Sequence, residues 1–403
     1  GQITLTQTLI GTALDIEGDI DVNGGIDVNG TSNLDVVDVD GAVNFAADVT
    51  FANGADIITA SAGTSNFRAG VNAGNSIASG GNYNVVVGDE AGTAITTGDS
   101  NIAIGFEALK TEDTNSFNVA IGHQALKVNN GGDANVAIGY QALVANTTAN
   151  NNVAIGNGAL TANTTATNNT AIGQSALTAN TTGTRNTAAG ARSGSQTTTG
   201  DFNAFFGYDA GESNTTADSN TAVGDSALRE TTTGASNTAV GQSALLANTT
   251  GANNVALGAL ALDANTTASS NVAVGASALT ATTTGALNVG VGSSAMAANT
   301  TGTLNASLGY NALGANTTGA SNVAVGALAL DANTTASNNT AVGYQALTSN
   351  VTGSENAAFG FRALDVNTGS YNNAFGSETL GANTSGANNT SFGHASLAAN
   401  TTA

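Results

Sequence analysis

A 17-residue unit repeats through most of this chain and limits the folds that the chain can adopt. Each unit opens with the pattern Asn-x-small-apolar-Gly, first seen at Asn84–Gly88, and nineteen copies run to the end of the sequence. The glycines recur every 17 residues, except for one 16-residue step between Gly360 and Gly376. Units of this size stack on their neighbours, so the period predicts a solenoid rather than a set of globular domains.

Two short apolar segments occur in each unit, one before the glycine and one around an Ala-Leu pair, and Asn, Thr and Gly bound both of them. We therefore expect two short strands per turn, in a flattened roll. Helix is disfavoured because Asn-Thr-Thr-Gly recurs too often to leave a stable helical length. The predicted fold is all-β, a parallel β-solenoid or β-roll of about nineteen turns, on the order of 90 Å long at about 4.8 Å per turn.

The strand before the glycine is apolar on both faces. The residue next to the glycine is apolar in all nineteen copies, and the residue before it is small in all but two, Val86 and Phe205. Successive strand residues face opposite sides of a sheet. We expect the larger apolar row to fill the inside and the row of small residues, mostly Ala, to lie outside, where another chain could approach closely. The pattern thus predicts that copies of the chain pack side by side.

The asparagine and the glycine of the motif are predicted to be structural. Stacked once per turn, the Asn side chains can form an amide ladder that satisfies turn backbone groups. The Gly row would supply a positive φ or room for a tight turn. The residues assigned to these rows are Asn84, Asn101, Asn118, Asn135, Asn152 and Asn169, with Gly105, Gly122, Gly139 and Gly156.

The chain divides by sequence into residues 1–80, an acidic N-terminal β shaft or attachment region, and residues 81–403, the repeat rod. In Leu14–Gly41, Asp and Asn alternate with aliphatic residues, which is typical of a half-buried strand with an acidic outer face. A calcium site is the weaker interpretation, because the spacing matches neither the EF-hand loop nor the calcium-binding nonapeptide. Residues 63–81 are expected to be a looser connection into the rod.

Composition excludes several classes of function. Seven Lys and Arg against 28 Asp and Glu give a net charge of −21, which disfavours binding to nucleic acid or to anionic membranes. The chain has no Cys and no apolar run of membrane-spanning length, so it offers no thiolate site and no membrane insertion. His123 and His394 lie many turns apart, and no catalytic set is assembled. We predict no enzyme activity, no cofactor and no metal.

The residue after the repeat glycine is often aromatic. Exposed aromatic rings beside hydrogen-bonding side chains are what a glycan site uses, although lateral packing is the preferred interpretation. The candidates for glycan contact are Phe106, Tyr140, Tyr208, Tyr310, Tyr344 and Phe361. Three units are irregular, with Gly92, Gly194 and Gly211 in place of the usual Leu, and are predicted to hold kinks, bulges or changes in packing.

The motif resembles repeats of two known kinds of fibrous protein. The segments Asn118–Ala125, Asn135–Ala142 and Asn152–Ala159 resemble the head repeats of trimeric autotransporter adhesins, and this resemblance implies a left-handed parallel β-roll in a homotrimer. The longer form with Ala-Leu and Asn-Thr-Thr-Gly, as in Tyr310–Gly319, is similar to repeats of bacteriophage tail-fibre proteins, especially marine ones. The acidic N-terminal segments resemble the shafts of those phage proteins.

These observations favour a structural fibre protein of a virion, located on the virion surface or outside cells. Its expected partners are copies of itself in a homotrimer, other fibre or virion proteins, and a host surface glycan. A bacterial trimeric surface adhesin or an extracellular filament subunit is the alternative. A polysaccharide depolymerase ranks low because carboxylates are sparse in the repeats, and an ice-binding protein ranks low because adjacent Thr in a turn do not share a flat face.

Overall fold

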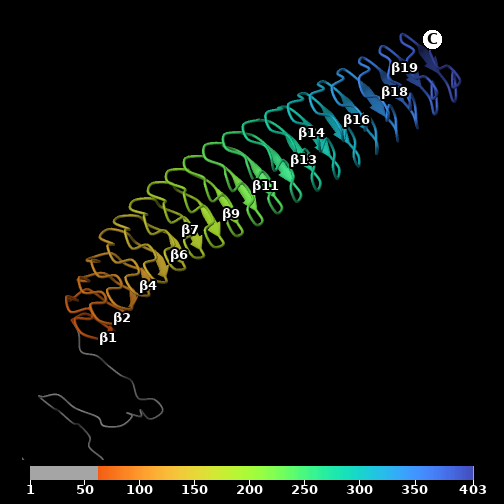
Figure 1. Ribbon diagram of the computed structural model, residues 1–403. Helices are drawn as coiled ribbons and strands as arrows, with labels where there is room; N and C mark the ends of the chain where they lie inside the picture. The colour runs from red at the N-terminus through yellow and green to blue at the C-terminus, as the bar shows by residue number, and fades with distance from the viewer. Residues whose placement is uncertain (1–61, 403) are drawn as a thin grey trace, which may run out of the picture. The chain divides into compact units, whose positions relative to one another are not determined.

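A computed structural model describes residues 62–402, all of which belong to one compact unit, Ile58–Ala403. The acidic shaft predicted for residues 1–80 lies mostly outside the described residues. Within them the fold is all-β and contains no helix, and the turns stack in a single row (Figure 1). The predicted parallel β-solenoid is therefore confirmed.

Each turn contributes one three-residue strand to a single parallel sheet. Every strand pairs in register with the strand of the next turn, as Val119 does with Val136 and Val136 with Val153. The strands are β1 (Phe67–Ala69), β2 (Val85–Val87), β3 (Ile102–Ile104), β4 (Val119–Ile121), β5 (Val136–Ile138), β6 (Val153–Ile155), β7 (Thr170–Ile172), β8 (Thr187–Ala189), β9 (Ala204–Phe206), β10 (Thr221–Val223), β11 (Thr238–Val240), β12 (Val255–Leu257), β13 (Val272–Val274), β14 (Val289–Val291), β15 (Ala306–Leu308), β16 (Val323–Val325), β17 (Thr340–Val342), β18 (Ala357–Phe359), β19 (Asn373–Phe375) and β20 (Thr390–Phe392).

Stacking begins one turn earlier than the repeat pattern indicates. β1 lies in the segment expected to be a looser connection, yet Phe67–Ala69 pairs in parallel with β2. The glycine that closes this turn, Gly70, is 18 residues before Gly88, and the late 16-residue step keeps β18 and β19 in register. A turn can thus be one residue longer or shorter than 17 without a change in the register of the sheet.

The prediction of a second strand around the Ala-Leu pair is wrong. The Leu of this pair is left-handed, with φ near +51° at Leu126 and +52° at Leu143, and the segment is a series of tight turns. Both residues of the pair are buried, as Ala125 and Leu126 are. Adjacent residues of a strand face opposite sides, so a strand could not bury both against one interior. Left-handed backbone is unfavourable for Leu, and bonds to adjacent turns hold it, such as Leu126 N to Ala142 O at 2.9 Å.

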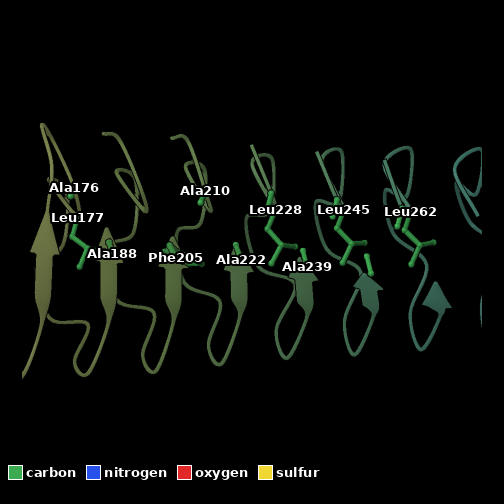
Figure 2. Close-up of a cluster of buried hydrophobic side chains, with 14 of the residues drawn as sticks. Ala176, Leu177, Ala188, Phe205, Ala210, Ala222, Leu228, Ala239, Leu245 and Leu262 are labelled. Carbon is green, nitrogen blue, oxygen red and sulfur yellow. The ribbon is translucent and has the colours of Figure 1, made fainter. Parts of the chain in front are cut away.

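The assignment of strand faces is also reversed. The middle residue of each strand, usually Ala, points inward and is fully buried from Ala103 to Ala374, whereas the flanking Val, Ile, Leu and Phe are partly or largely exposed. The Ala row is therefore the inner row and the larger apolar rows are the outer ones. The Leu side chains of the turn segment fill the interior, so little space remains for a large residue on the inner face of the strand (Figure 2).

Leu side chains fill the space between the turn segment and the sheet. In Figure 2, Leu228, Leu245 and Leu262 point from the turn segment toward the strand row that contains Ala222 and Ala239. A Cβ added to Gly290 would lie 3.3 Å from Leu279, so the Leu of one turn packs over the middle strand residue of the next turn. Each Leu thus ties two turns together.

The irregular turns keep the same backbone and change only their packing. Gly194 and Gly211 have φ of +57° and +61°, close to the values of Leu at this position. The buried ring of Phe205 occupies the space that both missing Leu side chains leave, because a Cβ on either glycine would lie within 2.8 Å of that ring. Figure 2 places Phe205 on the inner face of the strand. Of the three alternatives predicted for these units, the change in packing applies here.

Gly92 shows the same exchange with aliphatic residues. Its φ is +51°, and an added Cβ would lie 2.8 Å from Ile95 and 3.2 Å from Val86. Val86 replaces the inner Ala, and both Val86 and Ile95 are fully buried. A large middle strand residue therefore accompanies the loss of Leu, which keeps the interior closely packed.

Candidate functional site

The Asn row lies at the start of each strand and is buried. The Oδ1 of Asn118 accepts from the backbone N–H of Asn135 at 3.0 Å, and the Nδ2 of Asn118 donates to the carbonyl of Gly132 in its own turn at 2.9 Å. The same two bonds are made by the other Asn of the row: Asn84, Asn101, Asn135, Asn152 and Asn169. Each Asn thus closes its own turn and holds the next one.

The Gly row bends the chain out of the sheet at a place where no side chain fits. Gly122 and Gly139 both have φ of +134°, and an added Cβ on Gly122 would lie 2.5 Å from the carbonyl oxygen of Gly139. Gly105 and Gly156 are in the same situation. Glycine is required here both for its backbone conformation and for the close approach of successive turns.

A second amide ladder runs seven residues after the glycine, and the sequence analysis missed it. Asn146 Nδ2 donates to Asn129 Oδ1 of the preceding turn at 2.8 Å and to the carbonyl of Ala149 at 3.1 Å. Asn146 is the first residue of a recurring Asn-Thr-Thr sequence, and the side chains of Asn129 and Asn146 are both fully buried. The recurrence of Asn itself was the signal, since a turn alone tolerates Asp or Ser there.

Threonine interrupts this second ladder in three turns. Thr197, Thr231 and Thr282 stand where Asn is usual, and a hydroxyl cannot replace both groups of an amide. Among the described residues, no hydrogen-bond partner faces the buried Oδ1 of the Asn before each of these Thr, namely Asn180, Asn214 and Asn265. An unsatisfied buried acceptor is destabilising by about 1–3 kcal/mol, so the ladder is weakened at these junctions and at Asn333, whose Oδ1 is also unsatisfied.

Glu112 is a carboxyl group inside the same ladder. It replaces the usual Asn, is fully buried, accepts from the backbone N–H of Asn115 at 2.7 Å and also accepts from the Nδ2 of Asn129. Burial raises the pKa of Glu112 to about 7, and the hydrogen bonds from Asn115 and Asn129 oppose the shift only in part. The desolvated carboxylate is unfavourable at this position.

Much of the chemical variety of the repeats lies on one strip of the solenoid, which we call the variable edge. It consists of the first, second and fifth residues after each repeat glycine, which lie beyond the end of the strand. Five of the seven Lys and Arg residues occupy these positions, together with the aromatic row. The edge thus brings together aromatic, basic, acidic and small residues of successive turns.

The aromatic row forms two stacked columns on the variable edge. Phe106, His123 and Tyr140 stack with ring centroids 5.1 and 5.3 Å apart, and Tyr344 and Phe361 stack at 5.7 Å. Within a column His123 is stacked on both sides, whereas Phe106, Tyr140, Tyr344 and Phe361 are stacked on one side. A sugar packs its C–H groups on an open ring face, so a stacked ring is a poorer candidate for glycan contact than a ring without a stacking partner.

The two remaining aromatic candidates differ from the columns and from each other. The guanidinium of Arg192 lies 4.8 Å from the ring centroid of Tyr208, so one face of that ring is covered. Tyr310 is 61% exposed, and its neighbours in the row are the small residues Ser293 and Ala327. Of the six predicted glycan contacts, Tyr310 has the most open ring.

Besides the pair of Arg229 with Glu230, ion pairs lie at three places on the variable edge. Glu107 bonds to Lys110 at 2.7 Å and to Lys127 at 2.6 Å, and Lys110 also pairs with Glu90. Hydrogen bonds from Lys110, Lys127 and Gln124 lower the pKa of Glu107 to about 2. The other two clusters are Arg192 with Asp209, joined from Nε to Oδ1 at 2.7 Å, and Arg362 with Asp365, joined from Nε to Oδ2 at 2.8 Å.

No metal centre is found in the part of the chain that the structure describes. Among residues 62–402, no three His, Asp or Glu side chains come close enough together to hold an ion. His123 is stacked between Phe106 and Tyr140 rather than directed at a carboxylate. The same residues include no helix that is long and apolar enough to cross a lipid bilayer.

Fold and surface together define the chain as a parallel β-solenoid with one strand per turn, two internal amide ladders and an edge of variable residues. Comparison of the sequence with models of known protein families finds no match, and comparison with curated proteins finds no similar one. Functional inference therefore depends on the surfaces of the solenoid.

Proposed function

We propose that this chain is a structural subunit of a fibre, in which copies pack side by side through the outer face of the sheet. The observation that carries the proposal is the uniformity of that face. The first and third residues of β2–β20 point outward, and none of these 38 positions holds a charged residue. A soluble monomer rarely leaves an apolar surface of this extent open.

Residue sizes on the outer face also support packing against a partner. Among β2–β20, Ala occurs at the first position of only three strands, and each of them has a large residue at the third. These pairs are Ala204 with Phe206, Ala306 with Leu308 and Ala357 with Phe359. A close-packed interface favours such compensation of side-chain volume, although Val255 with Leu257 and Thr187 with Ala189 do not follow it.

A second copy of the chain is the occupant that the charges favour. With a net charge of −21, like chains repel each other over most of their surface, and a charge-free strip is where that repulsion is smallest. The resemblance to trimeric autotransporter heads sets the expected number of copies at three. In this arrangement the fibre spans distance, and other fibre or virion proteins attach to its ends.

Oligomeric state in solution tests the proposal. We expect the chain to be trimeric by native mass spectrometry or light scattering, and Val272→Asp with Val289→Asp on the outer face to produce monomers that keep β circular dichroism. The matched control is Thr280→Asp on the variable edge, which should remain trimeric. A monomeric unmodified chain at micromolar concentration would refute association through the sheet.

A virion fibre is the preferred setting, and a bacterial surface adhesin or extracellular filament is the second candidate. The variable edge favours the second candidate. A surface that changes from turn to turn suits contact with a binding partner, whereas a protein that only spans distance does not need such a surface. Detection of the chain in purified virions would support the first setting, and detection on uninfected cells would support the second.

A further inference from the structure

Two successive turns of the variable edge hold an oriented polar pair, and its amide residue directly follows Tyr310 in the chain. Asn311, the residue after Tyr310, donates from Nδ2 to Oδ1 of Asp331 in the next turn. Gly314 makes room for this amide, because a Cβ at Gly314 would lie 2.5 Å from Asn311 Oδ1. Only one other turn has glycine at that position, at Gly381. The amide and the carboxylate are therefore held in place on the edge that also carries Tyr310.

An internal duplicate shows that this arrangement is specific. The segment Gly326–Ser337, which contains Asp331, is identical in sequence to Gly258–Ser269, which contains Asp263. Asp263 accepts from the hydroxyl of Thr280 at 2.5 Å. Thr348 stands at the corresponding place after Asp331, yet Asp331 bonds to Asn311 instead. The preceding turn, through Asn311 and Gly314, redirects the carboxylate.

The carboxylate of Asp331 is suited to accept hydroxyl donors. It is half-buried, and burial raises its pKa. No Lys or Arg within residues 62–402 forms an ion pair with it, in contrast to Glu107, Asp209 and Asp365. A desolvated carboxylate without a cation gains most from additional hydrogen-bond donors. Asn311 Oδ1 adds a second acceptor beside it.

We propose that Tyr310, Asn311 and Asp331 form a binding site for one neutral hexose unit of a saccharide. The sugar ring packs its C–H face on the open face of Tyr310, and adjacent hydroxyl groups donate to the free oxygen of Asp331 and to Asn311 Oδ1. An acidic sugar is rejected because its carboxylate would meet that of Asp331. The site lies within one chain and does not depend on assembly through the sheet.

Saturation-transfer NMR on the full chain tests the site, with methyl glucoside, methyl galactoside and methyl mannoside as neutral probes and methyl glucuronate as the anionic probe. We expect saturation of at least one neutral hexoside and none of the glucuronate. Tyr310→Ala and Asp331→Ala should weaken binding about tenfold or more, whereas Tyr310→Phe should retain it. The matched controls, Tyr140→Ala and Asp263→Ala, should bind as the unmodified chain does.

A gain of a site provides the second test. The changes Gln242→Tyr, Ser243→Asn and Leu246→Gly would rebuild the same surroundings around Asp263, and should double the number of sites per chain. The proposal is overturned if no neutral hexoside binds or if Tyr310→Ala binds the hexoside normally. It is also overturned if Asp263→Ala loses as much hexoside affinity as Asp331→Ala does. Light scattering on the same samples reports assembly separately, so failure of this site and failure of the fibre proposal are distinguishable.

Discussion

The inner rows and the variable edge are built by the same repeat but tolerate change very differently. The inner rows are the two Asn ladders, the Gly row, the strand Ala and the Leu of the turn segment, and their residues pack against inner-row residues of the same turn or of adjacent turns. The variable edge meets solvent and holds aromatic, acidic, basic and small residues in successive turns. Contact with an identical neighbour keeps a row uniform, and its absence leaves a row free to acquire binding groups.

The largest expected difference between the two regions is at the Gly row. Gly241→Val should destabilise the solenoid by about 4 kcal/mol or more, because its Cβ would lie 2.6 Å from the carbonyl of Gly258 at a φ of +135°. Gln242→Val, one residue later on the variable edge, should change stability by less than about 0.5 kcal/mol. Thermal unfolding followed by circular dichroism measures the stability of both variants. Equal melting curves would contradict the difference in tolerance between the Gly row and the variable edge.

Phe205 tests whether packing alone explains the irregular turns. Phe205→Ala should reduce stability by about 3–5 kcal/mol, because the interior would then lack the ring and the Leu at both Gly194 and Gly211. Adding Gly194→Leu and Gly211→Leu should recover much of the loss. Phe206→Ala, on the outer face, should have a far smaller effect on the monomer, and failure of the rescue would point to a backbone difference.

The first Asn ladder should show an intermediate effect. Asn152→Ala removes the bond to Ala166 O at 2.9 Å and leaves the N–H of Asn169 without its acceptor, which should destabilise by about 2–3 kcal/mol. Asn157→Ala in the same turn, on the exposed edge, is the control and should be nearly neutral. Native-state hydrogen exchange of the Asn169 amide should rise only in the first variant.

Glu112 and Glu107 should produce opposite pH effects. The pKa of Glu112 in the folded chain, about 7, is above its ordinary 4.5, so its stability contribution is full below pH 4.5, declines as pH rises to 7, and is then level. The pKa of Glu107 is lowered to about 2, so its contribution is full above pH 4.5 and is lost as pH falls toward 2.

Glutamine at either position removes the corresponding pH dependence. Glu112→Gln should raise the melting temperature above pH 7 and have little effect near pH 4, whereas Glu107→Gln should lower it at neutral pH by a small amount. Melting temperatures of both variants between pH 3 and 8 check the sign. The same direction of change in both variants would show that the two carboxyl groups do not differ as described.

The period of the sequence was enough to predict the solenoid, its parallel register and nearly all of its turns. It was not enough to decide which strand face is inner. Hydrophobicity ranks Ile104 and Val223 above Ala as core residues, yet the interior is too shallow for them once Leu is present. The size exchange between Phe205 and Gly194 carried that information, because two positions that trade volume must be in contact.

The site on the variable edge was only partly predictable. The aromatic row was visible in the sequence, but ring stacking, which separates Tyr310 from Tyr140 and Phe361, depends on the identity of residues 17 positions away. The bond from Asn311 to Asp331 depends on Gly314, which looks like any other glycine in the sequence. Contacts between turns decide such sites, and a single repeat does not reveal them.

The identity of every junction along the Gly row has a consequence for how such a chain changes length. Because Gly122 meets Gly139 as Gly241 meets Gly258, duplication or deletion of a unit would produce a junction with the same Gly contact as every other junction. Unequal recombination within the coding sequence could therefore lengthen or shorten the rod in whole turns of about 4.8 Å. The length of the rod could then change in evolution while the interior stays the same. Each new unit would also add residues to the variable edge.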